Sequence, residues 1–240
     1  MRAGKFARSR SHLEEVLALY DPISHRLLAY QTGDDLHADS QAFLGNVLFC
    51  LGFPDQALAQ SSAAIAAARR LAHLPSLAAS LTNGTTVLSL VGDHAALDEW
   101  VDQVVAVTTE QGFPAWRAQG TIFRGWVKVK NGDVAEGISL LRSGSSAYRA
   151  TGAELWMPHY IALLARAGDI AGQIEEAVTL LDDALRIVER TGERWFAAEL
   201  HRHKGQLLLR QGHSEAAEEL YRKALSVAQE ALICVRLWSC

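Results

Sequence analysis

Glycine recurs in this sequence every 40 residues, and this spacing constrains the fold more than any other feature. A fixed period of this size is typical of tandem structural units. The first series comprises Gly52, Gly92, Gly132, Gly172 and Gly212. A second series with the same period lies midway and comprises Gly112, Gly152 and Gly192. Because glycine costs about 0.5–1 kcal/mol in a helix interior relative to alanine, glycines at such even intervals predict chain reversals between helices.

The segments between these glycines have the apolar spacing of amphipathic helices. In the last segment Ala217, Leu220 and Tyr221 recur at positions i, i+3 and i+4, which places them on one helix face. Each repeat is therefore expected to contain two helices. The first helices are predicted over 38–51, 76–91, 115–131, 154–171 and 194–211. The second helices are predicted over 54–71, 94–111, 134–151, 174–191 and 214–231.

A single helical hairpin of this length cannot bury its apolar faces, so the hairpins are expected to stack. We predict an all-α solenoid of five helix-turn-helix repeats over 38–231, coiled into a right-handed superhelix with a concave groove. The period alone does not choose among helical repeats of about this length, which include armadillo and HEAT repeats. Residues 1–37 are expected to form an N-terminal capping half-repeat, in which a short helix in SHLEEVLALY ends at Asp21 and Pro22. Residues 232–240 form an apolar C-terminal end, for which the expectation is either a truncated chain or an end that docks on a partner or on itself.

Small residues recur where the two helices of a repeat are expected to cross, and these residues identify the repeat type. In the first helices they are Gly45, Thr85, Gly125, Ala165 and Gly205. In the second helices the two sets are Ala57, Leu97, Gly137, Ala177, Ala217 and Ala64, Val104, Gly144, Ala184, Ala224. This pattern resembles the tetratricopeptide repeat, most closely in HRHKGQLLLRQGHSEAAEELYRKAL and least closely in the second repeat. The period of 40 exceeds the usual length of about 34, which predicts longer helices or connections.

A narrower resemblance covers most of the chain. The phrases that carry it are HLEEVLALYDPISHR, LGFPDQAL, EQGFPAWRAQGTIFRGW, YRATGAEL, HYIALLARAGDIAGQIEEA, ERTGERWFAAELHRHKGQLLL and AAEELYRKALSVAQ. They resemble the C-terminal repeat region of large bacterial proteins that carry an adenylate cyclase or transcription-regulator module followed by an AAA-type ATPase. The resemblance implies a bacterial signalling context. It implies neither cyclase nor ATPase activity for these residues, because the motifs of those domains are missing from them.

Composition and motifs argue against several other functions. The net charge of −4 gives no global attraction for nucleic acid. Three cysteines without metal-ligand spacing indicate a reduced, cytoplasmic chain, and no apolar stretch is long enough to cross a membrane. Phosphate-binding and hydrolase motifs are absent, so we predict no enzyme activity, no catalytic residue and no cofactor. His201 and His203 point in divergent directions on a predicted helix, which argues against a metal site.

The side chains expected to face the groove define the predicted partner-binding site. They are Asn46, Trp126, Lys130, His159, Arg166, Arg202, Gln206 and Arg210, with Asp39, Thr82 and Thr86 at equivalent positions. The C-terminal half of this set is basic, which suits an acidic peptide or a C-terminal carboxylate. The alternative is that these are ordinary solvated charges on open helix faces.

A protein-binding scaffold is therefore the predicted function, as a regulatory or sensory module of a bacterial signalling ATPase or cyclase. The partner is expected to be a protein or an acidic peptide in the groove, with no role for nucleic acid or membrane. One alternative is that the chain carries the name and cyclic-nucleotide signalling role of an adenylate cyclase parent. Another is a homo-oligomerisation module that associates through 232–240, whose apolar residues have no following repeat to cover them.

Overall fold

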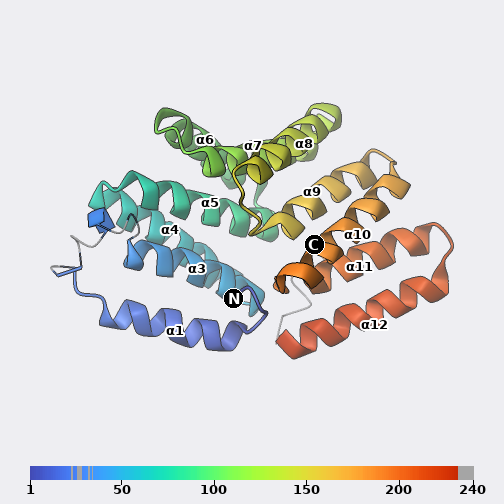
Figure 1. Ribbon diagram of the computed structural model, residues 1–240, viewed down its shortest axis with the longest axis horizontal. Helices are drawn as coiled ribbons and strands as arrows, with labels where there is room; N and C mark the ends of the chain where they lie inside the picture. The colour runs from blue at the N-terminus through green and yellow to red at the C-terminus, as the bar shows by residue number, and fades with distance from the viewer. Residues whose placement is uncertain (23, 26–28, 32, 34, 232–240) are drawn as a thin grey trace. The chain divides into compact units, whose positions relative to one another are not determined.

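The computed structural model describes residues 1–231 apart from 23, 26–28, 32 and 34, and all regular structure within this part of the chain is helical. The described chain divides into two compact units, which can be followed by colour in Figure 1. The N-terminal unit runs from Phe6 to Gly120. The C-terminal unit holds Met1–Lys5 together with the chain from Thr121 onward. The expected apolar end at 232–240 lies outside the described residues.

The N-terminal unit is built from hairpins of antiparallel helices. Its helices are α1 (Phe6–Leu19), α3 (Leu36–Cys50), α4 (Pro54–Leu71), α5 (Leu74–Val91), α6 (His94–Glu110) and the start of α7 (Pro114–Lys130). Helix α3 packs on α4, α4 on α5 and α5 on α6, and α3 also contacts both α1 and α5. Helix α1 begins earlier than expected, and Phe6 at its first turn is buried. The segment that follows α1 is only partly described.

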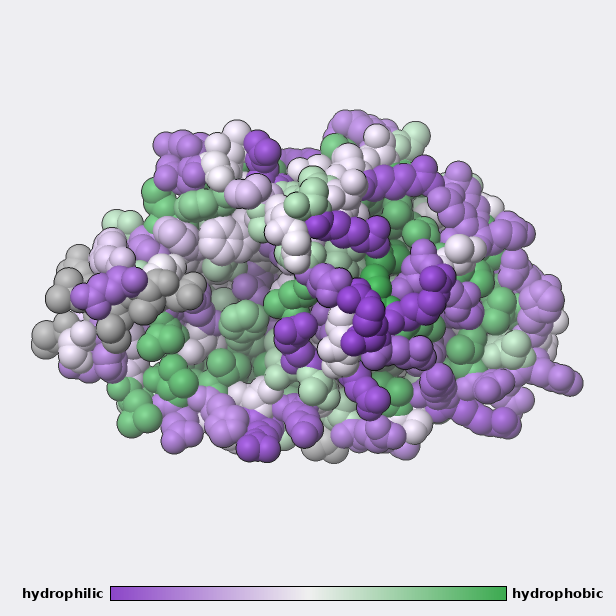
Figure 2. Space-filling model, viewed as in Figure 1, coloured by the Kyte–Doolittle hydropathy of each residue, from purple (hydrophilic) through white to green (hydrophobic). Residues whose placement is uncertain are grey.

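The C-terminal unit continues the same plan. Its helices after α7 are α8 (Val134–Ala150), α9 (Met157–Ile170), α10 (Ile174–Thr191), α11 (Ala197–Arg210) and α12 (Ser214–Ala231). The pairs α9–α10 and α11–α12 each pack as a hairpin. Hydrophilic side chains cover most of the outward surface of α12, at the lower right of Figure 2. The predicted amphipathic pattern of this helix is confirmed in part: Ala217, Ala224 and Ala228 are buried, Leu220 and Tyr221 are half-buried, and Leu225 is 49% exposed.

The glycines of both series adopt the left-handed backbone conformation predicted for chain reversals. Gly132 has a φ of 94° and Gly192 a φ of 70°, and every other member of the two series also has a positive φ. A residue with a β-carbon is strained in this region, so glycine ends these helices at little cost. The helices predicted from the glycine spacing are all present, with most ends within one or two residues of the predicted ones.

Two helices, α9 and α11, begin three residues later than predicted. The chain before α9 turns at Trp156, whose φ of 72° is unusual for a bulky side chain. Sequence periodicity gives no sign of this turn, because Trp156 continues the apolar pattern of the helix. Its backbone N–H instead donates a hydrogen bond to the carboxylate of Glu193 in the next repeat.

Glycines also permit the close helix crossings that were expected. A β-carbon added at Gly125 would lie 2.8 Å from the Gly137 carbonyl oxygen, and one at Gly205 would lie 3.1 Å from the Tyr221 ring. In the second hairpin the tight position is Gly84, one residue before the expected Thr85. A β-carbon there would lie 2.2 Å from the Trp100 ring, so the bulk of this indole fills the space that a small partner residue leaves elsewhere.

Candidate functional site

Three of the predicted groove positions in the N-terminal unit are buried, and a fourth, Asp39, is half-buried. Asn46 has no exposed surface, and Thr82 and Thr86 are 4% and 2% exposed. Their polar groups bond within the chain: Asn46 donates to Asn83 on α5 at 3.1 Å, and Thr82 donates to the Ala78 carbonyl. Helices α3 and α5 pack directly against each other, which covers the face that was expected to be open. Asn46 therefore cannot contact a partner in this structure.

Two further predicted contacts, Trp126 and His159, are also buried. Trp126 is 5% exposed, and the Lys130 ammonium lies 5.6 Å from the centre of its ring. This cation–π contact leaves Lys130 exposed to solvent while the indole belongs to the core. His159 is 1% exposed and lies in the interior. The expectation that these aromatic rings face a groove is corrected.

Aromatic rings from two helices, α7 and α9, and from the loop before α11 surround His159. Its ring lies 4.7 Å from that of Phe196, 5.4 Å from Trp195, 5.9 Å from Tyr160 and 6.3 Å from Phe123. Neither ring nitrogen has a hydrogen-bond partner among the described residues. Burial, aided by the charge of a nearby arginine, lowers the pKa of His159 to about 3. The imidazole is therefore neutral near pH 7, in agreement with an apolar environment.

The arginines of the predicted basic strip are paired with carboxylates. Glu199 on α11 is 4% exposed, and it accepts two hydrogen bonds of 2.6 Å from Arg202. Arg166 on α9 approaches the same carboxylate at 3.6 Å. The third guanidinium nitrogen of Arg202 donates to Gln206 at 3.3 Å. Bidentate pairing fixes the Arg202 guanidinium in one orientation, with some donors left for another group.

A second ion pair lies near the C-terminal ends of the same two helices. Arg210 pairs with Asp169, and the His203 ring lies 3.9 Å from this carboxylate. Burial lowers the pKa of His203 to about 4, so His203 is uncharged near neutral pH. Gln206 and Arg210 are exposed. We call the surface formed by Arg166, Arg202, Gln206 and Arg210 on these two helices the α9–α11 charged face.

The charge of this face is lower than the sequence suggested. Three arginines are balanced by Glu199 and Asp169, which leaves a net charge of +1. Both carboxylates lie on the helices that carry the arginines, but the predicted basic charge of the strip took only the cations into account. Helical spacing does pair Glu199 with Arg202 at i, i+3, and this signal was available in the sequence.

A buried carboxylate that the sequence analysis missed organises the turn before α9. Glu193 has no exposed surface, and one of its oxygens accepts 2.9 Å hydrogen bonds from the Trp156 backbone N–H and the Trp195 indole N–H. The two indole rings meet edge to face at 4.9 Å. Burial raises the pKa of Glu193. The recurrence of an acidic residue and a tryptophan just after Gly152 and Gly192 was the available signal.

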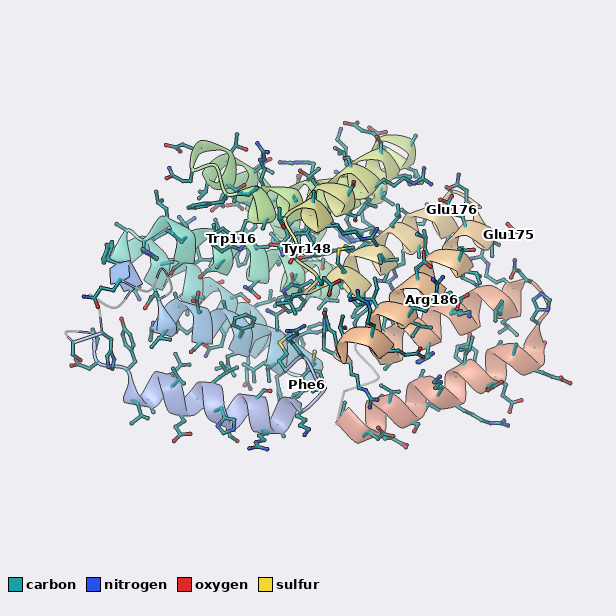
Figure 3. The ribbon with its side chains drawn as sticks, in the orientation of Figure 1. Phe6, Trp116, Tyr148, Glu175, Glu176 and Arg186 are labelled. Atoms are coloured by element: carbon teal, nitrogen blue, oxygen red, sulfur yellow. The ribbon has the colours of Figure 1, made fainter. Side chains whose placement is uncertain are left out.

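Surface ion pairs also link successive hairpins in this unit. Arg142 on α8 pairs with Glu176 on α10 at 2.5 Å, and Figure 3 shows Glu175 and Glu176 directed outward at the start of α10. Exposed pairs of this kind contribute little stability. Within the described part of the chain, no group of three histidine, cysteine, aspartate or glutamate side chains is arranged to hold a metal ion. The same residues contain no helix long and apolar enough to span a bilayer.

Known proteins similar to this chain support the repeat assignment. Residues 160–230 match the model of the tetratricopeptide repeat family. An uncharacterized protein, R02095, from Rhizobium meliloti (strain 1021) is 26% identical over 230 residues. This alignment covers 94% of the chain but 22% of the relative, so the chain spans about a fifth of the length of that protein.

Solved structures with low sequence identity share the fold. A Rap protein complexed with competence and sporulation factor is 15% identical, with a TM-score of 0.62, over 96% of this chain and 60% of that one. BtubC from P. vanneervenii is 12% identical, with a TM-score of 0.58, over 94% of this chain and 91% of that one. The fold is therefore an all-helical, tetratricopeptide-like solenoid.

Proposed function

We propose that this chain is a protein-binding module and that its partner contacts the α9–α11 charged face. The observation that carries the proposal is the fixed orientation of Arg202, whose guanidinium is held by Glu199 and Gln206 on its own helix. A side chain held in this way loses little entropy when a partner binds. The exposed Gln206 and Arg210 extend the surface by one to two helical turns.

The chemistry of this face favours a partner segment with one or a few acidic groups. An incoming carboxylate meets the donors of Arg202 and Arg210 that Glu199 and Asp169 do not use. Because the net charge of the face is +1, a strongly acidic ligand would encounter repulsion from these two carboxylates. Ile170 and Leu209, which adjoin Asp169 and Arg210 in the chain, are 54% and 49% exposed and offer apolar contact beside the charges.

We further propose that the module serves a larger bacterial signalling protein in the cytoplasm, an ATPase or a cyclase. The support is the length of the Rhizobium meliloti relative, of which the aligned region is only a fifth. In such a protein the helical array would act as a regulatory or sensory element and would perform no chemistry itself.

Paired capture experiments with charge-matched variants test the binding proposal. The face variant combines Gln206→Glu with Arg210→Gln, which lowers the charge by two and leaves Glu199 and its partners intact. The control combines Arg186→Gln with Arg222→Gln, which changes the charge equally at exposed positions of α10 and α12. Partners captured from a bacterial lysate would be identified by mass spectrometry, purified and titrated by calorimetry against each form.

We expect a partner whose affinity falls at least about tenfold for the face variant and stays unchanged for the control, since a charged hydrogen bond contributes about 1.5–3 kcal/mol. Its affinity should also fall with added salt. Equal binding of every partner to both variants would contradict the proposal. Thermal unfolding of each variant would show that the fold is retained.

A further inference from the structure

A cavity lies in the C-terminal unit away from the α9–α11 charged face. Its volume is about 270 Å³, roughly nine times the volume of one water molecule in the liquid. Its lining comes from the end of α8, the loop before α9, the start of α9 and the last turns of α10. These residues are Arg149, Gly152, Ala153, Glu154, Met157, Ile187 and Arg190.

One side of the cavity is closed by an ion pair. Arg190 donates to both carboxylate oxygens of Glu154, at 2.7 and 3.1 Å. Arg190 holds the pKa of Glu154 below its usual range, so the carboxyl stays ionised at neutral pH. This pair ties the loop before α9 to α10 and leaves neither partner's charge unbalanced.

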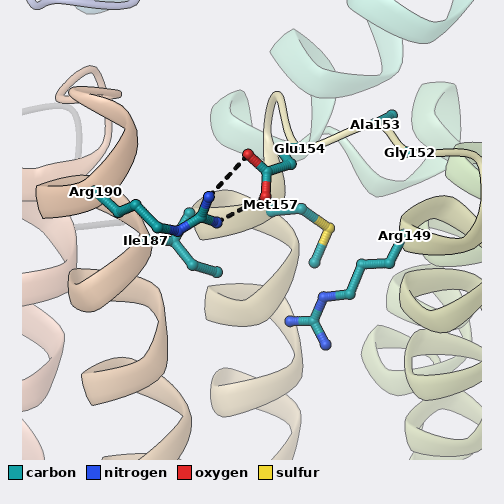
Figure 4. Close-up of a pocket in the computed structure, with 7 residues that line it drawn as sticks. All are labelled: Arg149, Gly152, Ala153, Glu154, Met157, Ile187 and Arg190. Atoms are coloured by element: carbon teal, nitrogen blue, oxygen red, sulfur yellow. Dashed lines mark hydrogen bonds and ion pairs between the residues drawn. The ribbon is translucent and has the colours of Figure 1, made fainter.

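The other side carries a cation without a partner. The Arg149 guanidinium makes no hydrogen bond or ion pair with any residue that the structure describes, and Figure 4 shows it directed into the space beside Met157. Two arginines and one glutamate leave the cavity with a charge of +1, and the unbalanced charge belongs to Arg149. An unpaired guanidinium presents several donors in one plane, an arrangement that matches a carboxylate.

The surface between the two sides is apolar. The half-buried Ile187 provides its accessible part, and Met157, which is 2% exposed, lies beneath it. Gly152 lies at the edge of the cavity, and a β-carbon added there would meet nothing within 4 Å. A cation facing an apolar floor defines a site for a small amphipathic anion.

We propose that this cavity binds a monocarboxylate with a short apolar chain, whose carboxylate pairs with Arg149 and whose chain packs on Met157 and Ile187. The carboxylate belongs either to a free short-chain acid or to the C-terminus of a peptide with an apolar last residue. The site is independent of the α9–α11 charged face, because the two share no residue.

Methyl NMR of the full chain tests this site directly. The sequence contains two methionines, Met1 and Met157, so [methyl-¹³C]methionine labelling gives one reporter on the cavity floor and one internal reference. Met157→Leu identifies the reporter signal. The probes are hexanoate, hexan-1-ol, inorganic phosphate and N-acetyl-leucine, the last of which stands for a peptide C-terminus.

The expected result is a saturable shift of the Met157 methyl signal with hexanoate or N-acetyl-leucine, with the stronger of the two identifying the source of the carboxylate. Hexan-1-ol and phosphate should bind at least about tenfold more weakly, because hexan-1-ol lacks the carboxylate and phosphate lacks the apolar chain. Arg149→Gln should weaken carboxylate binding about tenfold, and Arg149→Lys should have an intermediate effect. Arg142→Gln, on the same helix but outside the cavity, should leave binding unchanged.

Three results would overturn the proposal: no shift of the Met157 signal, an equal shift with hexan-1-ol, or an equal shift in the Arg149→Gln variant. Arg149 is exposed and unpaired, so its replacement should leave the fold intact. An unchanged Met157 signal in the ligand-free variant would show this.

Discussion

The two compact units bury polar side chains of different chemistry. In the N-terminal unit these are mostly hydroxyls, such as Thr82 and Thr108, which donate to carbonyls of their own helices. In the C-terminal unit they include His159, Glu193 and Glu199, which are ionisable and surrounded by rings or ion pairs. The comparison teaches that the same arrangement of helical hairpins accommodates both kinds of buried polar side chain. The buried histidines and glutamates of the C-terminal unit make its stability depend on pH.

The largest expected effect follows from removal of the buried carboxylate of the C-terminal unit. Glu193→Ala leaves the Trp156 amide N–H and the Trp195 indole N–H buried without their acceptor. At about 1–3 kcal/mol for each orphaned donor, we expect a loss of about 3 kcal/mol in the free energy of unfolding. Urea unfolding measures the loss, and hydrogen exchange should locate it at the start of α9.

Glu193→Gln serves as the control, because it keeps an acceptor at the same place and should cost less. A loss below about 1 kcal/mol for Glu193→Ala would show that the contact is dispensable. The comparison between the units would then lose its main support.

A smaller effect is expected at the helix crossings, where the two units also differ. A β-carbon at Gly125 would lie 2.8 Å from backbone atoms of α8, whereas the closest atom to one at Gly45 would be the Ser61 side-chain hydroxyl at 2.7 Å, with the Ala57 carbonyl oxygen at 3.0 Å. Gly125→Ala should therefore destabilise the chain by about 2 kcal/mol and Gly45→Ala by less. Chemical denaturation of both variants measures the difference.

Gly168→Ala is the matched control for the crossings. The nearest atoms to its added β-carbon would lie at 3.8 Å, an ordinary contact distance. Alanine should then stabilise α9 by up to about 1 kcal/mol through its higher helix propensity. Equal losses at all three positions would mean that crossing distance does not control stability here.

Acid should weaken the C-terminal unit through its buried histidines. The folded-state pKa of His159 is about 3, below the ordinary value of 6.5, so the unfolded chain binds more protons between these values. The stability of the neutral form is fully present above pH 6.5 and is lost as the pH falls toward 3. At pH 5 the loss is about 2 kcal/mol for this residue.

His159→Phe should remove the part of the stability loss at low pH that comes from His159. His213→Gln, at an exposed position, should not change the pH dependence. Unfolding at pH 7.5 and pH 5.0 gives the measurement for each variant. His201 and His203, with pKa values lowered by burial to about 4, should keep the remaining acid sensitivity of the unit. An identical pH dependence of the wild type and His159→Phe would contradict the assignment.

The smallest effect is expected for a buried hydroxyl of the N-terminal unit. Thr82→Val removes the hydroxyl that donates to the Ala78 carbonyl, an acceptor on its own helix. We expect a change within about 1 kcal/mol, because no donor is left without an acceptor. A loss as large as that of Glu193→Ala would erase the difference between the two units.

The sequence alone determined the helices and their turns. The glycine series predicted the reversals because a positive φ excludes most other residues, and the apolar spacing predicted the helix faces because helical geometry is local. The small residues at Gly45, Gly125 and Gly205 predicted close crossings for the same reason. Because the sequence is periodic, the same local interactions recur in each repeat, and the structure predicted for one repeat applies to the others.

Only the tertiary structure decided what the polar side chains do. Asn46, Trp126 and His159 are buried by packing between helices that lie far apart in the sequence, and the arginines of α9 and α11 meet Glu199 and Asp169 across two helices. Burial and ion pairing depend on which faces come together in three dimensions, and helical periodicity specifies only which residues share a face. The sequence thus determined the scaffold, whereas the packing determined which charges remain available for binding.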